Sequence, residues 1–365
     1  MPKPVLIFFY LLVAGLTLLV FYGFWQSPIT LYDEAVYANN ALEMSQGGHP
    51  FILTLDHAPT LYNTKPPLAI WLMAICIKIF GANEFAVRLP SVLAFVCLAI
   101  ALTRFSKQYF NSIIPGIFSV IILLGSQGLM FTHGARTGDL DMLFVLFATL
   151  FVLSVVRLLV SDVSRVNKHL IWSGIYFLAA YFTKSTAIFL FIPGLLISLL
   201  LSQNRKYIVT KKVFYLVPLA SLLIIACYYW MMDKIFPGYT SQVFFSEYKR
   251  AYANIMPWHK RPFGWYFDNL FHGRFTPYVY AVIPAIIIGC IVGKGIVKRV
   301  VVLLSIVSLS YLLFISFVPD KLEWYDIPVY PLFTLLIGIA LYELLKRTLS
   351  PNLIPIIASA CCLLI

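Results

Sequence analysis

The sequence predicts an all-α fold, a polytopic membrane helical bundle, and three observations support this. Hydrophobic residues make up 61% of the 365 residues and charged residues only 12%, with a mean hydropathy of +0.88. A soluble domain would be roughly half apolar and about a quarter charged. The apolar residues form long runs, most near the ~20 residues that a spanning helix needs. Because the charges gather between these runs, we expect about 11 membrane spans in one domain over residues 1–365.

The expected spans follow the apolar runs in order. They lie at 5–25, 84–105, 113–131, 140–160, 170–183, 186–202, 213–232, 276–292, 299–318, 327–345 and 353–365. The first is expected to be a retained signal anchor, because it is too long for a signal-peptide core and no cleavage site follows. The runs 170–183 and 186–202 are short, so we expect them to be tilted, broken or partly re-entrant. The chain ends inside an apolar run, and truncation at the C-terminus is an interpretation that stays open.

The distribution of charge decides how the apolar run 65–81 lies. If this run does not cross and the N-terminus is cytoplasmic, the inner side holds only two acidic residues, Asp162 and Glu343. It then holds 15 basic residues: Lys3, Arg104, Lys107, Arg157, Arg165, Lys168, Arg205, Lys206, Lys211, Lys212, Lys294, Lys298, Arg299, Lys346 and Arg347. This agrees with the positive-inside rule at every loop. We therefore expect 65–81 to be a helix lying on, or dipping into, the outer face. The net charge of +12 is then explained by the basic residues of the inner loops, and it does not indicate a nucleic-acid partner.

Two long outer-face loops, 26–83 and 233–275, carry most of the features that do not serve membrane crossing. In the first, Asp33–Ser45 is expected to be a helix that Gly47 and Gly48 close, with acidic residues at the positive end of its dipole. The second mixes aromatic and basic residues, which favours the level of the lipid headgroups.

Charged side chains from five separate loops are expected on the outer face. They are Asp33, Glu34, Lys65, His133, Arg136, Asp139, Asp141, Lys184, His259, Lys321, Glu323 and Asp326. Charge is costly in such a chain, so its convergence on one face indicates a functional site. The absence of a Walker loop, GxSxG, HExxH or a Rossmann fingerprint leaves nucleotide-driven transport and serine hydrolysis without support.

Each of these residues also has a purely structural interpretation. Asp33 and Glu34 either cap a helix or supply a general base. Lys65, fixed by two prolines, either snorkels to headgroups or holds a lipid phosphate as a leaving group. Arg136 either pairs with Asp139 or binds phosphate, and Lys184 and Lys321 are further candidates for the phosphate. Asp139 and His259 are candidates for a second acidic group or for a Mg, Mn or Zn ion, although no ligand spacing is diagnostic.

Several short motifs resemble the polyprenol-phosphate-dependent GT-C glycosyltransferases, above all the aminoarabinose transferase and protein mannosyltransferase group. The likeness covers residues 5 to about 345, and its first-loop part is fairly specific. The motifs are Asp33-Glu34-Ala35-Val36-Tyr37-Ala38 with Glu43-Met44, Lys65-Pro66-Pro67-Leu68, Phe80-Gly81, Arg88-Leu89-Pro90, Ala135-Arg136-Thr137 with Leu140-Asp141, and Tyr325 to Pro328 with Tyr330-Pro331.

The resemblance implies a sugar donor on a polyprenyl phosphate and an active site facing the periplasm of a bacterial inner membrane. By matching position, Asp33 would be the leading catalytic carboxylate, Lys65 would bind donor phosphate, and Asp141, rather than Asp139, would be the second acidic residue. The aminoarabinose transferases usually have Glu before Lys-Pro-Pro, where it helps to hold a metal, and this chain has Thr64. That departure puts a bound metal in doubt, and no cofactor is certain.

The sequence therefore predicts an inverting membrane glycosyltransferase that uses a polyprenyl-phosphate sugar donor. Its acceptor would be a lipid, a glycan or a protein, and membrane lipid would be a further partner. A lipid-linked sugar flippase is the alternative function. A transporter should show charges deep in its spans or broken helices in two related halves, and the sequence shows neither clearly.

Overall fold

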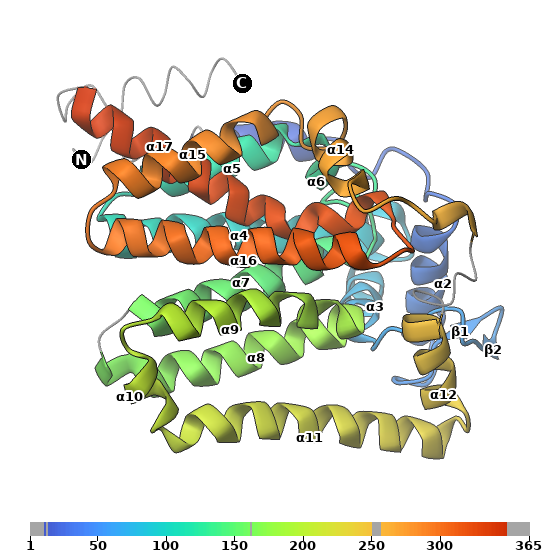
Figure 1. The fold of residues 1–365 in the computed structure, drawn as a ribbon. Coiled ribbons are helices and arrows are strands. Elements are labelled where there is room, and N and C mark those ends of the chain that lie inside the picture. Colours follow the sequence, from blue (N-terminus) through green and yellow to red (C-terminus); the bar gives the residue numbers. More distant parts are fainter. Residues whose placement is uncertain (1–10, 12–13, 161–162, 250–256, 349–365) are drawn as a thin grey trace.

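The computed structural model describes residues 11, 14–160, 163–249 and 257–348. Figure 1 shows long helices running side by side along one direction, with short elements collected at one end. The predicted all-α fold is confirmed, since the described strands are only β1 (Thr54–Leu55) and β2 (Ala58–Pro59), an antiparallel pair.

The long helices form the body of the molecule. After a first helical stretch over 14–21, they are α4 (Glu84–Phe110), α5 (Ile114–Gly125), α7 (Asp141–Val160), α8 (Val166–Lys184), α9 (Ile192–Leu201), α11 (Lys212–Ile235), α15 (Val279–Val292), α16 (Ile296–Phe317) and α17 (Tyr330–Thr348). Among the described residues, six helical stretches are long and apolar enough to cross a membrane. The predicted number of spans remains a prediction.

The short elements lie mainly at the end of the bundle on the right of Figure 1. Those in the first long loop and around the chain reversals are α2 (Asp33–Ser45), α3 (Leu68–Phe80), α6 (Gln127–Met130), η2 (Ser185–Phe191), α12 (Tyr239–Phe244), η3 (Phe245–Lys249), η4 (Pro257–His259), α14 (Trp265–His272) and η5 (Glu323–Val329). Two others, η1 (Val163–Arg165) and α10 (Arg205–Val209), lie at the opposite end.

Helix α3 lies at the same end of the bundle as α2 and the other short elements (Figure 1), and the predicted position of 65–81 on the outer face of a membrane stays a prediction. Its 13 residues span about 20 Å at 1.5 Å per residue, less than the ~30 Å of a hydrocarbon core. It packs against α2 and α4. The predicted helix over Asp33–Ser45 is confirmed with the same bounds as α2.

The core of the bundle is apolar, and α7 and α17 are its most buried spans. Helices α5 and α17 approach closely at Gly338, where an added Cβ would lie 2.2 Å from the carbonyl oxygen of Pro115. A small residue permits this contact between backbones, which is how membrane helices without a hydrophobic drive between them gain packing energy.

Three of the predicted apolar runs can be compared in detail with the helices. The run 113–131 is not one helix: α5 ends at Gly125, Ser126 adopts an extended conformation, and α6 follows. The chain leaves the helix there because the N–H of Gly128 bonds the carbonyl of Arg274 instead of continuing a longer helix. The runs 170–183 and 186–202, expected to be tilted, broken or partly re-entrant, are broken: η2 separates α8 from α9, and Figure 1 shows the chain turning back there.

Candidate active site

The acidic pair at the start of α2 is split between two environments. Glu34 is 2% exposed, and its Oε1 and Oε2 accept from Arg88 Nε at 2.6 Å and Nη2 at 3.0 Å. Thr30 N and Gly138 N each donate to the same carboxylate at 2.7 Å. Burial alone would raise the pKa of Glu34, but these bonds hold the pKa below its usual value. Glu34 therefore anchors α2 to α4 and to the loop before α7.

Gly138 is the residue that lets this loop reach Glu34. An added Cβ there would lie 2.4 Å from Val87 Cγ1 and 3.3 Å from Glu34 Oε1. The close approach brings Asp139 and Asp141 to the same end of the bundle as the start of α2. A tight backbone contact thus places acidic residues from two distant loops near one another.

Asp33, in contrast, makes no side-chain hydrogen bond or ion pair within the described part of the chain, and no side chain caps the start of α2. The capping interpretation is therefore not what the structure shows. Burial raises the pKa of Asp33 above its usual value. The charges of His133 and Lys184 offset part of this rise, and those of Asp139 and Asp141 add to it. A carboxylate with a raised pKa and no fixed partner is suited to accept a proton.

We define the carboxylate cluster as Asp33, His133, Asp139, Asp141 and Lys184. His133 Nδ1 lies 3.3 Å from Asp139 Oδ1 and 3.6 Å from Asp141 Oδ2, and Lys184 Nζ pairs with Asp141 Oδ1. The cluster holds three carboxylates and two potential cations. Its members come from α2, the loop before α7, the start of α7 and the end of α8, so the predicted convergence of separate loops is confirmed for these five residues.

His133 is charged over the physiological range. Burial lowers the pKa of His133, but the contacts with Asp139 and Asp141 outweigh it and raise the pKa to about 9. The contact with Asp139 is electrostatic in character, because within the described residues neither Nδ1 nor Asp139 Oδ1 makes a hydrogen bond with good geometry. The imidazolium therefore partly neutralises the aspartates without fixing their lone pairs.

Two aromatic residues of η5 cover the cations of the cluster. Trp324 stacks on the His133 ring with centroids 3.6 Å apart and an angle of 16° between the planes. The Lys184 ammonium lies 5.1 Å from the centre of the Tyr325 ring. Cation–π contact of this kind favours the charged forms of both groups. The late aromatic motif is thus part of the site.

We define the Lys65 site as Lys65, Thr186 and Glu247. Lys65 Nζ pairs with Glu247 Oε1, and Thr186 Oγ1 donates to Glu247 Oε2 at 2.8 Å. The two sites are linked through the chain, because Lys184 reaches Asp141 and Thr186 reaches Glu247 from either side of Ser185.

Unusual backbone conformations mark the edges of this region. Among the described residues, six other than glycine have positive φ, and three are His133, Tyr32 before Asp33, and Ser185 after Lys184. Such conformations cost of order 1–3 kcal/mol each and persist where the surroundings enforce them. One of these three residues belongs to the carboxylate cluster and the other two adjoin members of it, which indicates that the cluster is a functional site.

The remaining predicted residues lie in other contacts. Arg136 donates to the carbonyls of Val20 and Tyr22, and the suggested pair with Asp139 is not observed. Lys321 is buried and donates to the carbonyls of Val318 and Arg261, and burial lowers the pKa of Lys321.

Three more of the residues predicted on the outer face lie apart from the contacts of the cluster. His259 pairs with Asp320 at 3.1 Å. Asp326 is buried and accepts from Tyr330 at 3.1 Å and Asn269 at 3.0 Å, while Glu323 is exposed. The structure therefore gives His259 no contact with Asp139, its fellow candidate for a metal or second acidic role.

Metal binding also remains a prediction. Over the described ranges, no three His, Cys, Asp or Glu side chains form a group with the spacing of a metal site. The groups that face Asp139 and Asp141 are His133 and Lys184, which are cationic and do not compete well as ligands while protonated.

Sequence reasoning missed three residues of the site. Arg88 was noted only as part of a motif, although a buried arginine needs a carboxylate partner. Glu247 is an isolated acid within an aromatic and basic loop, and that isolation was the available signal. Nothing in the local sequence around Trp324 indicates a stack on His133.

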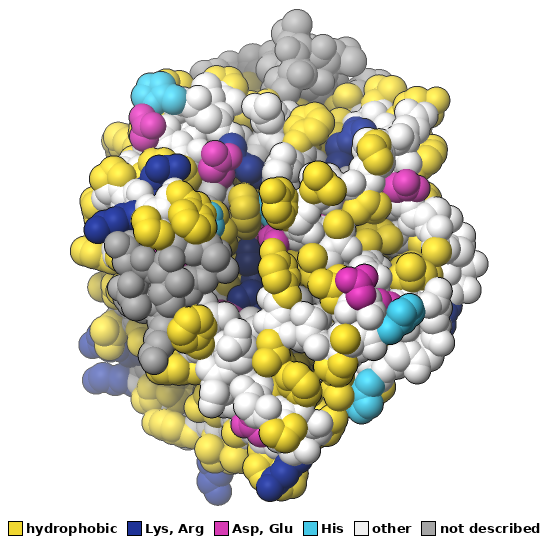
Figure 2. Space-filling model, turned by 90° about the vertical axis from the view of Figure 1, so that its right-hand side faces the viewer, with side chains coloured by type: hydrophobic (Ala, Val, Ile, Leu, Met, Phe, Trp, Pro, Cys, Tyr) yellow, Lys and Arg dark blue, Asp and Glu magenta, His cyan; other side chains and the backbone are white. Residues whose placement is uncertain are grey.

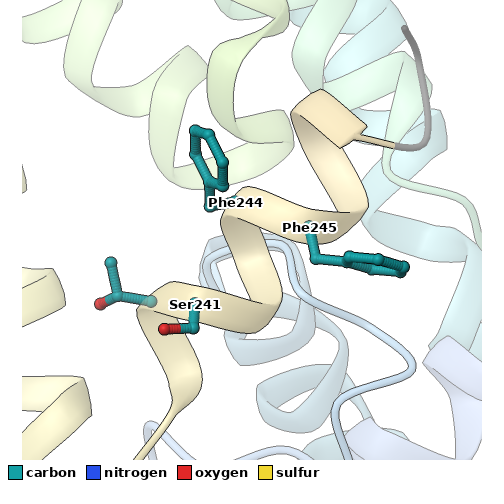
Figure 3. Close-up of a pocket in the computed structure, with 4 residues that line it drawn as sticks. Ser241, Phe244 and Phe245 are labelled. Atoms are coloured by element: carbon teal, nitrogen blue, oxygen red, sulfur yellow. The ribbon is translucent and has the colours of Figure 1, made fainter. Parts of the chain in front are cut away.

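Figure 2 shows the end of the molecule that carries these residues. Lys or Arg and Asp or Glu side chains meet in a recess near the middle of this face, surrounded by hydrophobic side chains. A separate hollow lies beside α12, lined by Thr240, Ser241, Phe244 and Phe245 (Figure 3). Because these four residues carry no titratable group, we assign the chemistry to the charged recess.

Comparison with known proteins supports the resemblance drawn from the motifs. Residues 64–230 match the family model of the dolichyl-phosphate-mannose-protein mannosyltransferases, a little under half of the chain. An uncharacterized protein of Aquifex aeolicus (strain VF5) is 24% identical over 325 residues, which are 88% of this chain and 62% of that protein. The chain thus spans less than two thirds of the length of this relative.

Solved structures confirm the fold. ArnT from Cupriavidus metallidurans bound to undecaprenyl phosphate matches with a TM-score of 0.78 at 18% identity, over 99% of this chain and 64% of that one. The apo form of the same protein gives 0.74 at 18% identity, over 94% of this chain and 60% of that one. An Archaeoglobus fulgidus oligosaccharyltransferase tethered to an acceptor peptide matches with a TM-score of 0.62 at 13% identity, over 98% of this chain and 53% of that one. The predicted GT-C-like helical fold is therefore confirmed.

Proposed function

We propose that this chain is a membrane glycosyltransferase that transfers a sugar from a polyprenyl-phosphate-linked donor to an acceptor hydroxyl or amide. The observation that supports the proposal most strongly is that two neighbouring sites present side chains of opposite charge. One presents the carboxylate of Asp33, which has no ion-pair partner among the described residues, and the other presents the ammonium of Lys65. The fold shared with ArnT, solved with undecaprenyl phosphate, supports the same class of donor.

The proposed reaction is a direct displacement at the anomeric carbon. Asp33 takes the proton of the acceptor as the acceptor atom forms its bond to that carbon. The bond between the anomeric carbon and the phosphate oxygen breaks, and its electron pair stays on the phosphate. Lys65 stabilises the charge that develops there. Attack from the face opposite the phosphate inverts the configuration of the sugar.

The other residues of the cluster hold Asp33 ready for this step. Asp139 and Asp141 disfavour a further negative charge nearby, which strengthens Asp33 as a base. His133 and Lys184 limit the total charge so that Asp33 is not neutralised at working pH. Glu34 and Arg88 fix the start of α2, so that the Asp33 backbone does not move during the reaction.

We further propose that the site faces the periplasm of a bacterial inner membrane and that the acceptor is a lipid, a glycan or a protein. The charge distribution that assigns the basic loops to the cytoplasm supports this orientation. The alternative of a lipid-linked sugar flippase is favoured by none of the contacts described above. A transporter would need its charges near the bilayer midplane, whereas the recess lies at one end of the bundle (Figure 2).

The proposal is tested by transfer from polyprenyl-phosphate donors that carry radiolabelled pentoses or hexoses, with the protein in nanodiscs and with lipid, glycan and peptide acceptors. We expect one donor and acceptor pair to give turnover that falls about 10²–10⁴-fold in Asp33→Asn. Asp56→Asn is the matched control, since Asp56 is exposed at the β1–β2 turn and Asn tolerates its positive φ. Movement of the intact donor across the bilayer without transfer would support the flippase instead.

A further inference from the structure

Glu247 has no role in the reaction proposed above, yet it occupies the cation on which that reaction depends. Its carboxylate binds Lys65 Nζ through Oε1 and accepts from Thr186 Oγ1 at 2.8 Å through Oε2. The Glu247 side chain is 8% exposed and the Lys65 side chain 27%. An incoming phosphate therefore meets a pair with no net charge, and the exposed partner is the lysine.

The position of Glu247 is fixed by several contacts. Thr64 Oγ1 and Ser246 Oγ lie 2.9 Å apart, and Tyr239 O–H donates to the carbonyl of Thr64 at 3.2 Å. These bonds tie the loop before α3 to α12 and η3, segments that lie more than 170 residues apart in the sequence. Because Thr186 also holds the carboxylate, Glu247 stays beside Lys65 when an anion binds, instead of swinging away.

The donor and the product of the proposed reaction differ in charge. A polyprenyl-phosphate sugar is a phosphodiester with one negative charge. The polyprenyl phosphate that remains is a monoester, which carries about −1.5 to −2 at pH 7 because its second pKa is about 6. A lone lysine would hold the dianion roughly twice as strongly as the monoanion in electrostatic energy. An enzyme with such a site would retain its lipid product.

We propose that Glu247 sets the preference of the Lys65 site for the singly charged donor over the doubly charged product. The carboxylate opposes the second charge of the monoester about as strongly as Lys65 attracts it. It thereby promotes the release of polyprenyl phosphate after transfer. This inference depends on the proposed function, because it assumes that the phosphate of a lipid-linked sugar lies at Lys65.

The experiment measures binding of two lipids of equal chain length, polyprenyl phosphate and its methyl phosphodiester, to the protein in nanodiscs at pH 8 and pH 5.5. For Glu247→Gln at pH 8 we expect the monoester to bind on the order of tenfold tighter relative to the diester than in the wild-type protein. At pH 5.5 the monoester carries a single charge, so this change should largely disappear. An unchanged affinity ratio in Glu247→Gln at pH 8 would overturn the inference.

Two further measurements guard against a variant that does not fold. In the wild-type protein alone, the monoester-to-diester affinity ratio should change little between the two pH values, and a strong rise in monoester preference at pH 8 would contradict the inference. Thr186→Val removes one hydrogen bond that holds Glu247 beside Lys65, so its affinity ratio should shift in the same direction as that of Glu247→Gln but by less. If the wild-type protein binds neither lipid, the proposed function itself fails. If it binds both and the ratios do not respond to Glu247, only this inference fails.

Discussion

The carboxylate cluster and the Lys65 site differ in which charged group is left accessible, an anion in the first and a cation in the second. In the cluster, His133 and Lys184 are buried against Asp139 and Asp141, whereas Asp33 makes no side-chain hydrogen bond or ion pair with any residue that the structure describes. At the Lys65 site the most accessible charged group is the cation, and a fixed carboxylate lies behind it. The cluster thus keeps one anion available as a base, while the Lys65 site keeps one cation available for an anion.

This difference shows how neighbouring residues of one motif come to have separate uses. Glu34 and Asp33 are adjacent in the sequence, yet four donors hold Glu34 and, over the described ranges, none holds Asp33. The anchored residue fixes the geometry, and the residue without partners is left to react. The predictions below test this separation, from the largest expected effect to the smallest.

The largest effect should follow loss of the anchor. Arg88→Met leaves the Glu34 carboxylate buried without its cation, because both side chains are 1% exposed. Removing one partner of such a pair typically costs about 3–5 kcal/mol. Thermal unfolding in detergent should show a strongly lowered Tm, and the double variant Glu34→Gln, Arg88→Met should recover part of the loss. Equal Tm values for Arg88→Met and the wild-type protein would contradict the anchoring role.

A smaller loss of stability is expected from breaking the pair between Asp141 and Lys184. Their side chains are 7% and 14% exposed, so the orphaned charge is partly relieved by water, and we expect about 2–3 kcal/mol for either single variant. Asp141→Asn and Lys184→Met combined should cost less than the two single changes added together. Additive losses would mean that the two groups do not stabilise each other.

Lys65→Met should weaken binding of polyprenyl phosphate, and it should also lower the Tm, because the Glu247 carboxylate is 8% exposed and loses its cation. Removing the ammonium while keeping the stem should cost about 1.5–3 kcal/mol in affinity for polyprenyl phosphate, the usual range for a hydrogen bond to a charged group. Lys78→Met is the matched control, because Lys78 is exposed near the end of α3. Equal affinities for the two variants would leave Lys65 as a surface anchor.

The smallest effect concerns the pH dependence of His133. Its pKa is raised from 6.5 to about 9, so its ion pairs with the aspartates contribute their full stability below pH 6.5, and this contribution is lost as pH rises from 6.5 through about 9. We expect the Tm to fall over this range and the transfer rate to fall near pH 9, where the folded protein loses the imidazolium charge. In His133→Gln this alkaline fall should be absent from both profiles. Persistence of the same fall in the variant would assign it to another group.

The fold was largely predictable from the sequence because membrane insertion imposes strong rules on the chain. Run length and the bias of basic residues indicated a short helix at 65–81, and the acidic start followed by Gly47 indicated α2 with its observed bounds. The local sequence did not predict the end of a helix where a contact with a residue far away in the sequence determines it. The break at Ser126 depends on the Arg274 carbonyl, which lies far away in the sequence.

The sequence predicted which residues belong to the candidate site better than it predicted which of them pair with each other. The sequence indicated that Asp33, His133, Asp141 and Lys184 share one face. It did not show that Glu34 pairs with Arg88, because residue type alone does not distinguish two adjacent acids, and only the family resemblance favoured Asp33 as the catalytic one. The partners Glu247 and Trp324 lie about 180 and 190 residues from Lys65 and His133, and tertiary packing alone brings them together.

The central claim, that Asp33 reacts while Lys65 binds, is tested most directly by measuring two quantities on Asp33→Asn: its affinity for polyprenyl phosphate and its rate of sugar transfer. The account predicts an affinity equal to or tighter than that of the wild-type protein, since one negative charge is removed, together with a rate lowered about 10²–10⁴-fold. Near-normal transfer by a stably folded Asp33→Asn would contradict it. So would a loss of lipid affinity that matches the loss in Lys65→Met.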